Sequence, residues 1–151
     1  MVMNSIDRYR DDFFRDITSL GSAYLLGGLG LIFLVVGQMD VFLKLIFILF
    51  STYIIAALVR MVYFKNRPKK QGYSDFMGKI DASSFPSVHA GRVVSTGLMF
   101  NEIFPELLGL IVLVGGLVLY SRIYLKKHDW VDISGGIVLG LIVFWIMGFV
   151  I

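Results

Sequence analysis

A series of long apolar segments is the feature that most constrains the fold. A helix needs about 20 predominantly apolar residues to cross a bilayer, and five segments of the chain meet or approach that length. They are residues 18–37, 41–64, 86–104, 105–125 and 130–151. No alternating strand pattern runs along the chain, and lipid requires backbone groups to be paired within helices or closed barrels. The sequence therefore predicts an all-α integral membrane helical bundle with about five transmembrane helices.

Composition indicates the same class. Of 151 residues, 57% are hydrophobic and 17% are charged, whereas soluble domains typically carry about 25% charged residues. Cysteine is absent, which excludes disulfides, thiolate zinc sites and a cysteine nucleophile. The length suits one compact bundle, so we predict a single membrane-embedded domain over residues 1–151. Within it, 1–17 form an amphipathic surface helix and 18–151 the transmembrane bundle.

The surface helix is predicted from a spacing pattern near the N-terminus. Its apolar residues recur at helical intervals, with acidic and basic residues between them: Ile6, Tyr9, Phe13, Phe14 and Ile17. Such a pattern is typical of an amphipathic helix lying on a membrane surface. The alternative interpretation is a frayed, solvated tail.

Both histidines of the chain lie at segment boundaries. His89 opens the third segment, which also contains Arg92 and Asn101 and is the least apolar. Polar residues within a span usually face the bundle interior or a water-filled cavity. His128 precedes the fifth segment, with Asp132 four residues later.

Alternating helix directions bring four separated regions to one membrane face. These regions are the end of the second segment, the start of the third, the end of the fourth and the start of the fifth. A basic cluster follows the second segment: Arg60, Lys65, Arg67, Lys69, Lys70 and Lys79. No nucleic-acid-binding motif appears, so the predicted partners are the bilayer and an anionic lipid rather than nucleic acid.

Three short patterns occur at this face. The first is a basic residue, six others and Arg-Pro, present as Arg60 with Arg67-Pro68; the second is Pro86-Ser87-Val88-His89. The third is Ser121-Arg122, then His128, then Asp132, followed at four and eight residues by Gly136 and Gly140. In order and spacing these patterns resemble the motifs of the type 2 phosphatidic acid phosphatase superfamily, which includes lipid phosphatases and vanadium haloperoxidases.

This resemblance implies a chemistry for each residue. It implies that His128 is a nucleophile forming a phosphohistidine and that Asp132 orients it. It also implies that His89 protonates the leaving alkoxide and then activates water. The implied phosphate-binding residues are Arg60, Arg67, Ser87, Val88 and Arg122. No metal or other cofactor is implied.

The residue types suit phosphoryl transfer on physical grounds as well. Arginine bonds two phosphate oxygens with its planar fork and keeps its charge, and a helix N-terminus offers free N–H groups to an anion. We expect Ser83 or Ser84 to cap the third helix, with Pro86 in its first turn, and Asp129 to cap the fifth. Two histidines and few acids make a poor magnesium site.

The sequence departs from the family pattern at two motif positions. Arg60 stands where lysine is commoner, and Val88 stands where glycine is usual. Family members commonly have six spans. The alternative function is therefore a catalytically inactive membrane protein that binds anionic lipid or a partner, and a transporter is a third interpretation. Each residue type also has a structural interpretation. Either histidine alone could be a packing residue, and the glycines allow close helix packing. Lysines at the ends of spans are typical topology anchors.

The predicted location is the cell membrane, as a multi-pass protein. Nearly all lysines and arginines lie toward the site face, which the positive-inside rule places in the cytoplasm. The predicted substrate is a lipid phosphate monoester or diphosphate entering from the bilayer. Phosphatidylglycerophosphate, phosphatidate and polyprenyl diphosphate all fit.

Overall fold

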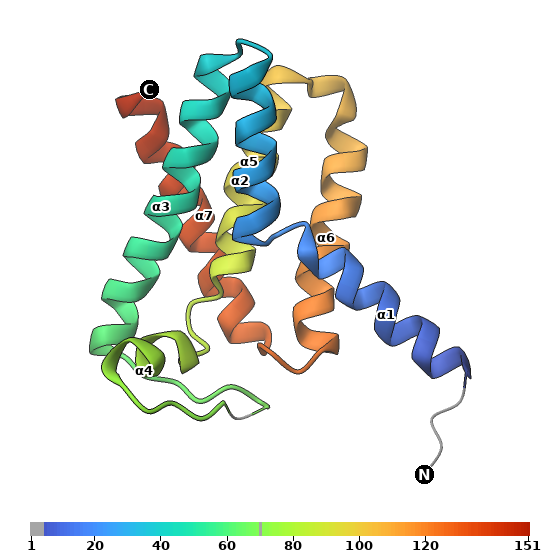
Figure 1. Ribbon diagram of the computed structural model, residues 1–151, viewed down its shortest axis with the longest axis vertical. Coiled ribbons are helices and arrows are strands. Elements are labelled where there is room, and N and C mark those ends of the chain that lie inside the picture. The colour runs from blue at the N-terminus through green and yellow to red at the C-terminus, as the bar shows by residue number, and fades with distance from the viewer. Residues whose placement is uncertain (1–4, 70) are drawn as a thin grey trace.

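The computed structural model describes residues 5–69 and 71–151, and these are helical with no strand. The helices are α1 (Ser5–Ser19), α2 (Ala23–Val35), α3 (Met39–Val62), α4 (Phe76–Ala82), α5 (Val88–Ile103), the 3₁₀ helix η1 (Pro105–Leu107), α6 (Leu108–Tyr124) and α7 (Trp130–Val150). In Figure 1, α2, α3, α5, α6 and α7 form an upright bundle, and α1 leans away from it on one side. The predicted all-α class is confirmed.

Three helical stretches are long and apolar enough to cross a membrane: Met39–Val62, Pro105–Tyr124 and Trp130–Val150. A fourth candidate is the pair formed by α1 and α2, which bends by 48°. Helix α2 has 13 residues and α5 has 16. Both are shorter than a typical span, which has about 20 residues. The helices suit a membrane protein, but the predicted count of five spans is not confirmed.

The outer surface of the bundle is apolar. Large side chains such as Leu31, Phe50, Leu113 and Trp145 are exposed on α2, α3, α6 and α7. A helix that is apolar around its whole circumference needs an apolar environment on every side. A surrounding bilayer provides this environment where neighbouring helices do not.

Glycine allows α5 and α7 to pack closely. A Cβ atom added at Gly136 would lie 2.5 Å from Cβ of Ala90, and one added at Gly140 would lie 2.6 Å from the carbonyl oxygen of Gly91. Only a residue without a side chain fits at these crossings. The core beside them is built by α3, α5 and α7, including Leu45, Ile48, Ala56, Met99 and Val143.

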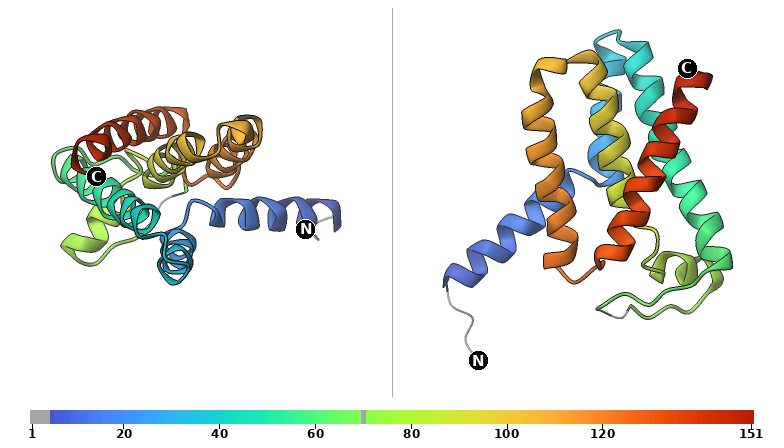
Figure 2. Two further views of the ribbon diagram at one scale, coloured as in Figure 1. Left: turned by 90° about the horizontal axis from the view of Figure 1, so that it is seen from above. Right: turned by 180° about the vertical axis from the view of Figure 1, so that it is seen from behind.

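One end of the bundle collects the ends of four helices. The last turns of α3 and α6 and the first turn of α7 lie at the bottom of Figure 1 together with α4, and the first turn of α5 lies above them in the lower half of the bundle. Figure 2 shows the same arrangement from behind. The predicted convergence of four sequence regions therefore appears in the fold. Helix α4 was not predicted; Asp75 caps it by accepting a hydrogen bond from the N–H of Gly78 at 2.9 Å.

Helix α1 is anchored to the end of α6. The Tyr124 ring lies 4.3 Å from that of Phe14, centroid to centroid. The Tyr124 hydroxyl accepts from Nε of Arg10 at 2.8 Å and donates to Asp11 at 2.6 Å. The helix is thus formed and docked, and Tyr9 on it stays exposed. Its position on a membrane surface stays a prediction.

Candidate active site

The first turn of α7 is held by two aspartates that cap each other. Asp129 accepts a hydrogen bond from the N–H of Asp132 at 3.0 Å, and Oδ2 of Asp132 accepts from the N–H of Asp129 at 3.1 Å. This reciprocal capping box fixes both carboxylates. The predicted capping role of Asp129 is confirmed.

A histidine faces this turn. Nδ1 of His128 lies 3.5 Å from Oδ2 of Asp132, and both side chains are buried. Within the described residues, this nitrogen makes no hydrogen bond. His128 precedes α7, so the contact comes from the capped first turn of the helix. Burial lowers the pKa of His128 below 6.5 despite Asp132, and the nearby Arg122 and Arg67 lower it further.

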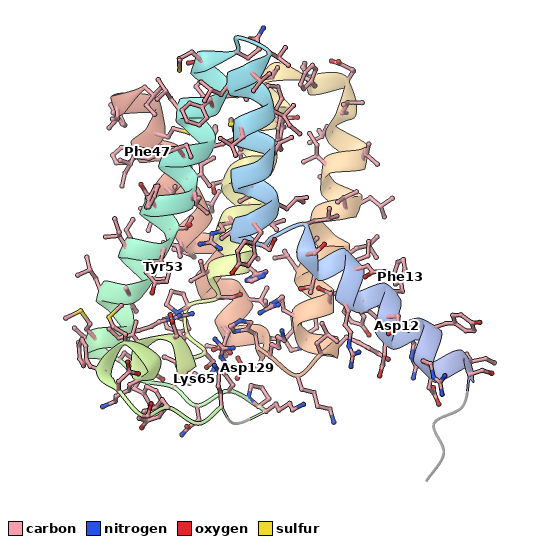
Figure 3. The ribbon with its side chains drawn as sticks, viewed as in Figure 1. Asp12, Phe13, Phe47, Tyr53, Lys65 and Asp129 are labelled. Carbon is pink, nitrogen blue, oxygen red and sulfur yellow. The ribbon has the colours of Figure 1, made fainter. Side chains whose placement is uncertain are left out.

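Lys65 binds both aspartates, a role that its place in the basic cluster does not predict. Its Nζ lies 2.8 and 2.7 Å from the two carboxylate oxygens of Asp129 and 2.8 Å from Oδ1 of Asp132. Figure 3 labels Lys65 and Asp129 together at the loop end of the bundle. Burial opposes the charge of Lys65, but these hydrogen bonds outweigh it and raise the pKa of the amine. The sequence feature that points to this role is the position of Lys65 inside the first motif, between Arg60 and Arg67.

Arg60, at the end of α3, is tied to the chain that leads into α5. Its Nη2 donates to the carbonyl of Pro86 at 2.8 Å and its Nη1 to that of Ile80 at 3.4 Å. The residue therefore holds the start of α5 against α3. Both terminal nitrogens of Arg60 donate to backbone carbonyls, so the residue has fewer free donors for a phosphate than its motif position implies.

Arg67 and Arg122 each use one nitrogen on a described partner. Nη2 of Arg67 donates to the carbonyl of Asp81 at 2.6 Å, and Nη1 of Arg122 donates to Oγ1 of Thr18 at 3.0 Å. Within the described residues, the Nε atoms of Arg60, Arg67 and Arg122 are buried without a hydrogen-bond partner. The three arginines also lie within electrostatic range, Arg67 acting on each of the others. Such a group of unsatisfied cationic donors is suited to an anion.

The start of α5 differs from the sequence prediction. Ser87, and neither Ser83 nor Ser84, caps the helix, accepting from the N–H of Ala90 at 3.4 Å. The two predicted caps serve other partners: Oγ of Ser83 accepts from the N–H of Lys65, and Oγ of Ser84 donates to Asp132. Local spacing could not reveal these contacts, because the partners come from other parts of the chain. Pro86 also precedes the cap instead of occupying the first turn.

The residues at the start of α5 lie against the first turn of α7. The N–H of Ser87 donates to the carbonyl of Asp132 at 3.0 Å. Val88 is the first helical residue and its side chain is buried in the core. Lys126 is the one non-glycine residue with a positive φ in the described part of the chain, so Val88 fits here without the backbone conformation that favours glycine.

His89 lies one residue further along α5. Its ring packs beside Gly21 in the α1–α2 joint, where an added Cβ would lie 3.2 Å from Cδ2 of His89. The charges of Arg122 and His128 are within electrostatic range of His89. The structure thus brings both histidines to the same end of the bundle.

A basic cavity of about 530 Å³ adjoins this group. It is lined by Arg15, Thr18, Arg67, Lys69, Gln71, Leu125 and Lys127. Its charged lining residues are all cationic, so it attracts anions from water. Lys70 of the predicted basic cluster lies outside the described residues. Within residues 5–69 and 71–151, no three His, Cys, Asp or Glu side chains are grouped to hold a metal ion.

The fold and these contacts define a class of protein: a membrane-type helical bundle with a buried histidine–carboxylate pair and clustered arginines at one end. The sequence matches the family model of the PAP2 superfamily over residues 41–149. The chain therefore belongs to the PAP2 superfamily, and its membership indicates phosphatase activity on phosphate esters. No curated protein and no solved structure matches the chain.

Proposed function

We propose that this chain is a membrane lipid phosphatase that acts through a phosphohistidine intermediate. The observation that carries the proposal is the His128–Asp132 pair, 3.5 Å apart, beside the electrostatically linked Arg67 and Arg122. A phosphate group provides the anionic oxygens that the unpartnered arginine nitrogens require. The substrate is a lipid phosphate monoester or diphosphate.

The proposed reaction has two displacement steps. Nδ1 of His128 faces Asp132, so Nε2 is the nitrogen that attacks phosphorus. The P–N bond forms as the P–O bond to the leaving group breaks, and His89 gives its proton to the leaving oxygen. Water then attacks the phosphohistidine, His89 accepts a proton from it, and the P–N bond breaks to release inorganic phosphate.

Three arginines and the start of α5 hold the phosphate in this proposal. Arg67 and Arg122 bind its oxygens, and Arg60 adds charge while it fixes the loop at Pro86. Ser87 and the N–H of Val88 contribute from the helix N-terminus. The basic cavity beside Arg67 attracts the anionic headgroup and lets the phosphate leave.

The surrounding membrane arrangement is part of the proposal. Helices α2 and α5 join the three long helices to give five membrane segments, and α1 lies on the membrane surface. The site end carries the excess of lysine and arginine, which supports a cytoplasmic side for it by the positive-inside rule. The lipid substrate reaches the site from within the bilayer of the cell membrane.

Two observations favour the rival function, an inactive protein that binds anionic lipid. Val88 replaces the usual glycine, and Arg60 uses both terminal nitrogens on backbone carbonyls. A phosphate-release assay distinguishes the phosphatase from the inactive lipid-binding protein. It is run in detergent with a metal chelator, on phosphatidate, phosphatidylglycerophosphate and a polyprenyl diphosphate. We expect release that vanadate inhibits, that His128→Asn abolishes and that the surface variant Arg8→Met retains. No release from any of these lipids, with lipid binding that survives His89→Ala, would establish the rival function.

A further inference from the structure

A second group of unsatisfied donors lies deeper in the bundle. Arg92 on α5 is 7% exposed, and among the described residues its Nε is buried without a partner. No carboxylate of the described residues forms an ion pair with Arg92. A buried, unpaired guanidinium within a membrane protein is costly and usually marks a functional position.

Arg92 lines a cavity of about 260 Å³ between α2, α5 and α6. The lining is otherwise almost entirely apolar and includes Leu20, Leu26, Phe100 and Val118. The other side-chain hydrogen-bonding group in this lining belongs to Thr96, whose hydroxyl is also buried without a partner among the described residues. The cavity therefore suits a hydrocarbon chain that carries one anionic group.

The cavity lies next to the candidate active site along α5. His89, Arg92 and Thr96 are spaced i, i+3 and i+7 and share one face of α5. Three residues advance a helix by about 4.5 Å, so Arg92 lies about one turn into the bundle from His89. The ring of His89 packs against Gly21, and the adjacent Leu20 lines the cavity. The basic cavity beside Arg67 is separate and has different lining residues.

We propose that Arg92 and Thr96 bind a second phosphate on the leaving-group side of the substrate, which makes the protein selective for lipid diphosphates. This inference rests on the proposed phosphatase function. When His128 attacks the terminal phosphorus, the bond to the bridging oxygen breaks and the leaving group is a lipid monophosphate. Charge develops on that leaving group, and the Arg92 guanidinium stabilises it. A monophosphate ester places no second anion beside Arg92.

The test compares two substrates that differ by one phosphate, farnesyl diphosphate and farnesyl monophosphate. We expect the wild-type protein to favour the diphosphate in kcat/KM. We expect Arg92→Met to lower the diphosphate-to-monophosphate ratio about 10- to 100-fold, because a hydrogen-bonded charge is lost. Arg92→Lys should keep part of the selectivity, and Thr96→Val should lower it less than Arg92→Met. The exposed Arg8→Met on α1 is the matched control.

The possible outcomes distinguish the diphosphate selectivity from the proposed phosphatase function. Wild-type turnover with a ratio unchanged by Arg92→Met and Thr96→Val would overturn the role of Arg92 and leave the phosphatase function standing. Turnover of neither substrate, nor of any other lipid phosphate, would overturn both. If Arg92→Met fails to elute as folded protein in detergent, Arg92→Lys and Thr96→Val decide the question by the same ratio.

Discussion

Nζ of Lys65 lies 2.8 Å from Oδ1 of Asp132, a carboxylate that is completely buried. The contact occupies one oxygen of Asp132 and leaves Oδ2 facing His128 at 3.5 Å. Lys65 also bonds both carboxylate oxygens of Asp129, the residue that caps α7. A single lysine from the α3–α4 connection thus fixes the turn that presents the proposed nucleophile.

Replacing Lys65 with methionine should impair turnover more than substrate binding. We expect kcat to fall about 10- to 100-fold, the usual effect of losing a residue that orients a reacting side chain, with little change in KM. Lys65→Arg should recover part of the loss, because it restores the charge. Lys79→Met is the control, since Lys79 is exposed on the adjacent helix α4. A kcat for Lys65→Met equal to that of Lys79→Met would contradict the positioning role.

The same variant should change the titration of His128. Burial keeps the pKa of His128 below 6.5, so the imidazole is neutral and nucleophilic at pH 7. Without Lys65, the charges of Asp129 and Asp132 are uncompensated and favour the imidazolium, so the pKa of His128 should rise. NMR titration of labelled histidine in a His89→Asn background measures this directly, because the chain has two histidines. An unchanged or lower pKa would show that Lys65 does not act through the carboxylates.

The α5–α7 crossing provides a stability prediction. Gly136→Ala should destabilise the protein by about 1–3 kcal/mol, the usual cost of overpacking, because the added carbon would meet Ala90 and the Ser87 carbonyl. Gly148→Ala is a matched control on the same helix, where an added Cβ would meet no atom within 4 Å. Thermal unfolding in detergent measures both. Equal midpoints for the two variants would show that the crossing tolerates a side chain at Gly136.

How much of the fold the sequence predicts depends on the range of the interactions involved. Apolar composition located α3 and α7 to within two residues at each end, since hydrophobicity is a property of each residue. It placed the boundary between the surface helix and the first span at residue 18, whereas α2 begins at Ala23, where Ser22 caps it by accepting from the N–H of Leu25. The position of the break is set by this cap, and several serine and threonine residues in the segment could have supplied it.

The candidate site shows the same limit. Motif order and spacing brought His89, Arg122 and His128 to one end of the bundle. They could not identify Lys65 as more than a member of a basic cluster, because its partners Asp129 and Asp132 are 64 and 67 residues away in sequence. A lysine at the end of a span has the same local signature whether it anchors topology or fixes a buried carboxylate.

The proposed orientation can be tested with single cysteines, because the natural chain has none. Gln38 lies at the α2–α3 turn and Lys79 at the site end, and both are exposed. In intact cells, we expect a membrane-impermeant maleimide to label Gln38→Cys and to label Lys79→Cys only after permeabilisation. The reverse pattern would place the site on the outer face.

Detection of a covalent intermediate tests the central claim, nucleophilic attack by His128, most directly. The protein would be mixed with a lipid phosphate carrying ³²P in its terminal phosphate, quenched in alkali and mapped by peptide. We expect base-stable label on the peptide that contains His128, increased in His89→Asn because hydrolysis of the intermediate slows, and absent in His128→Asn. Full phosphate release by His128→Asn, or label on a different residue, would contradict the proposed mechanism.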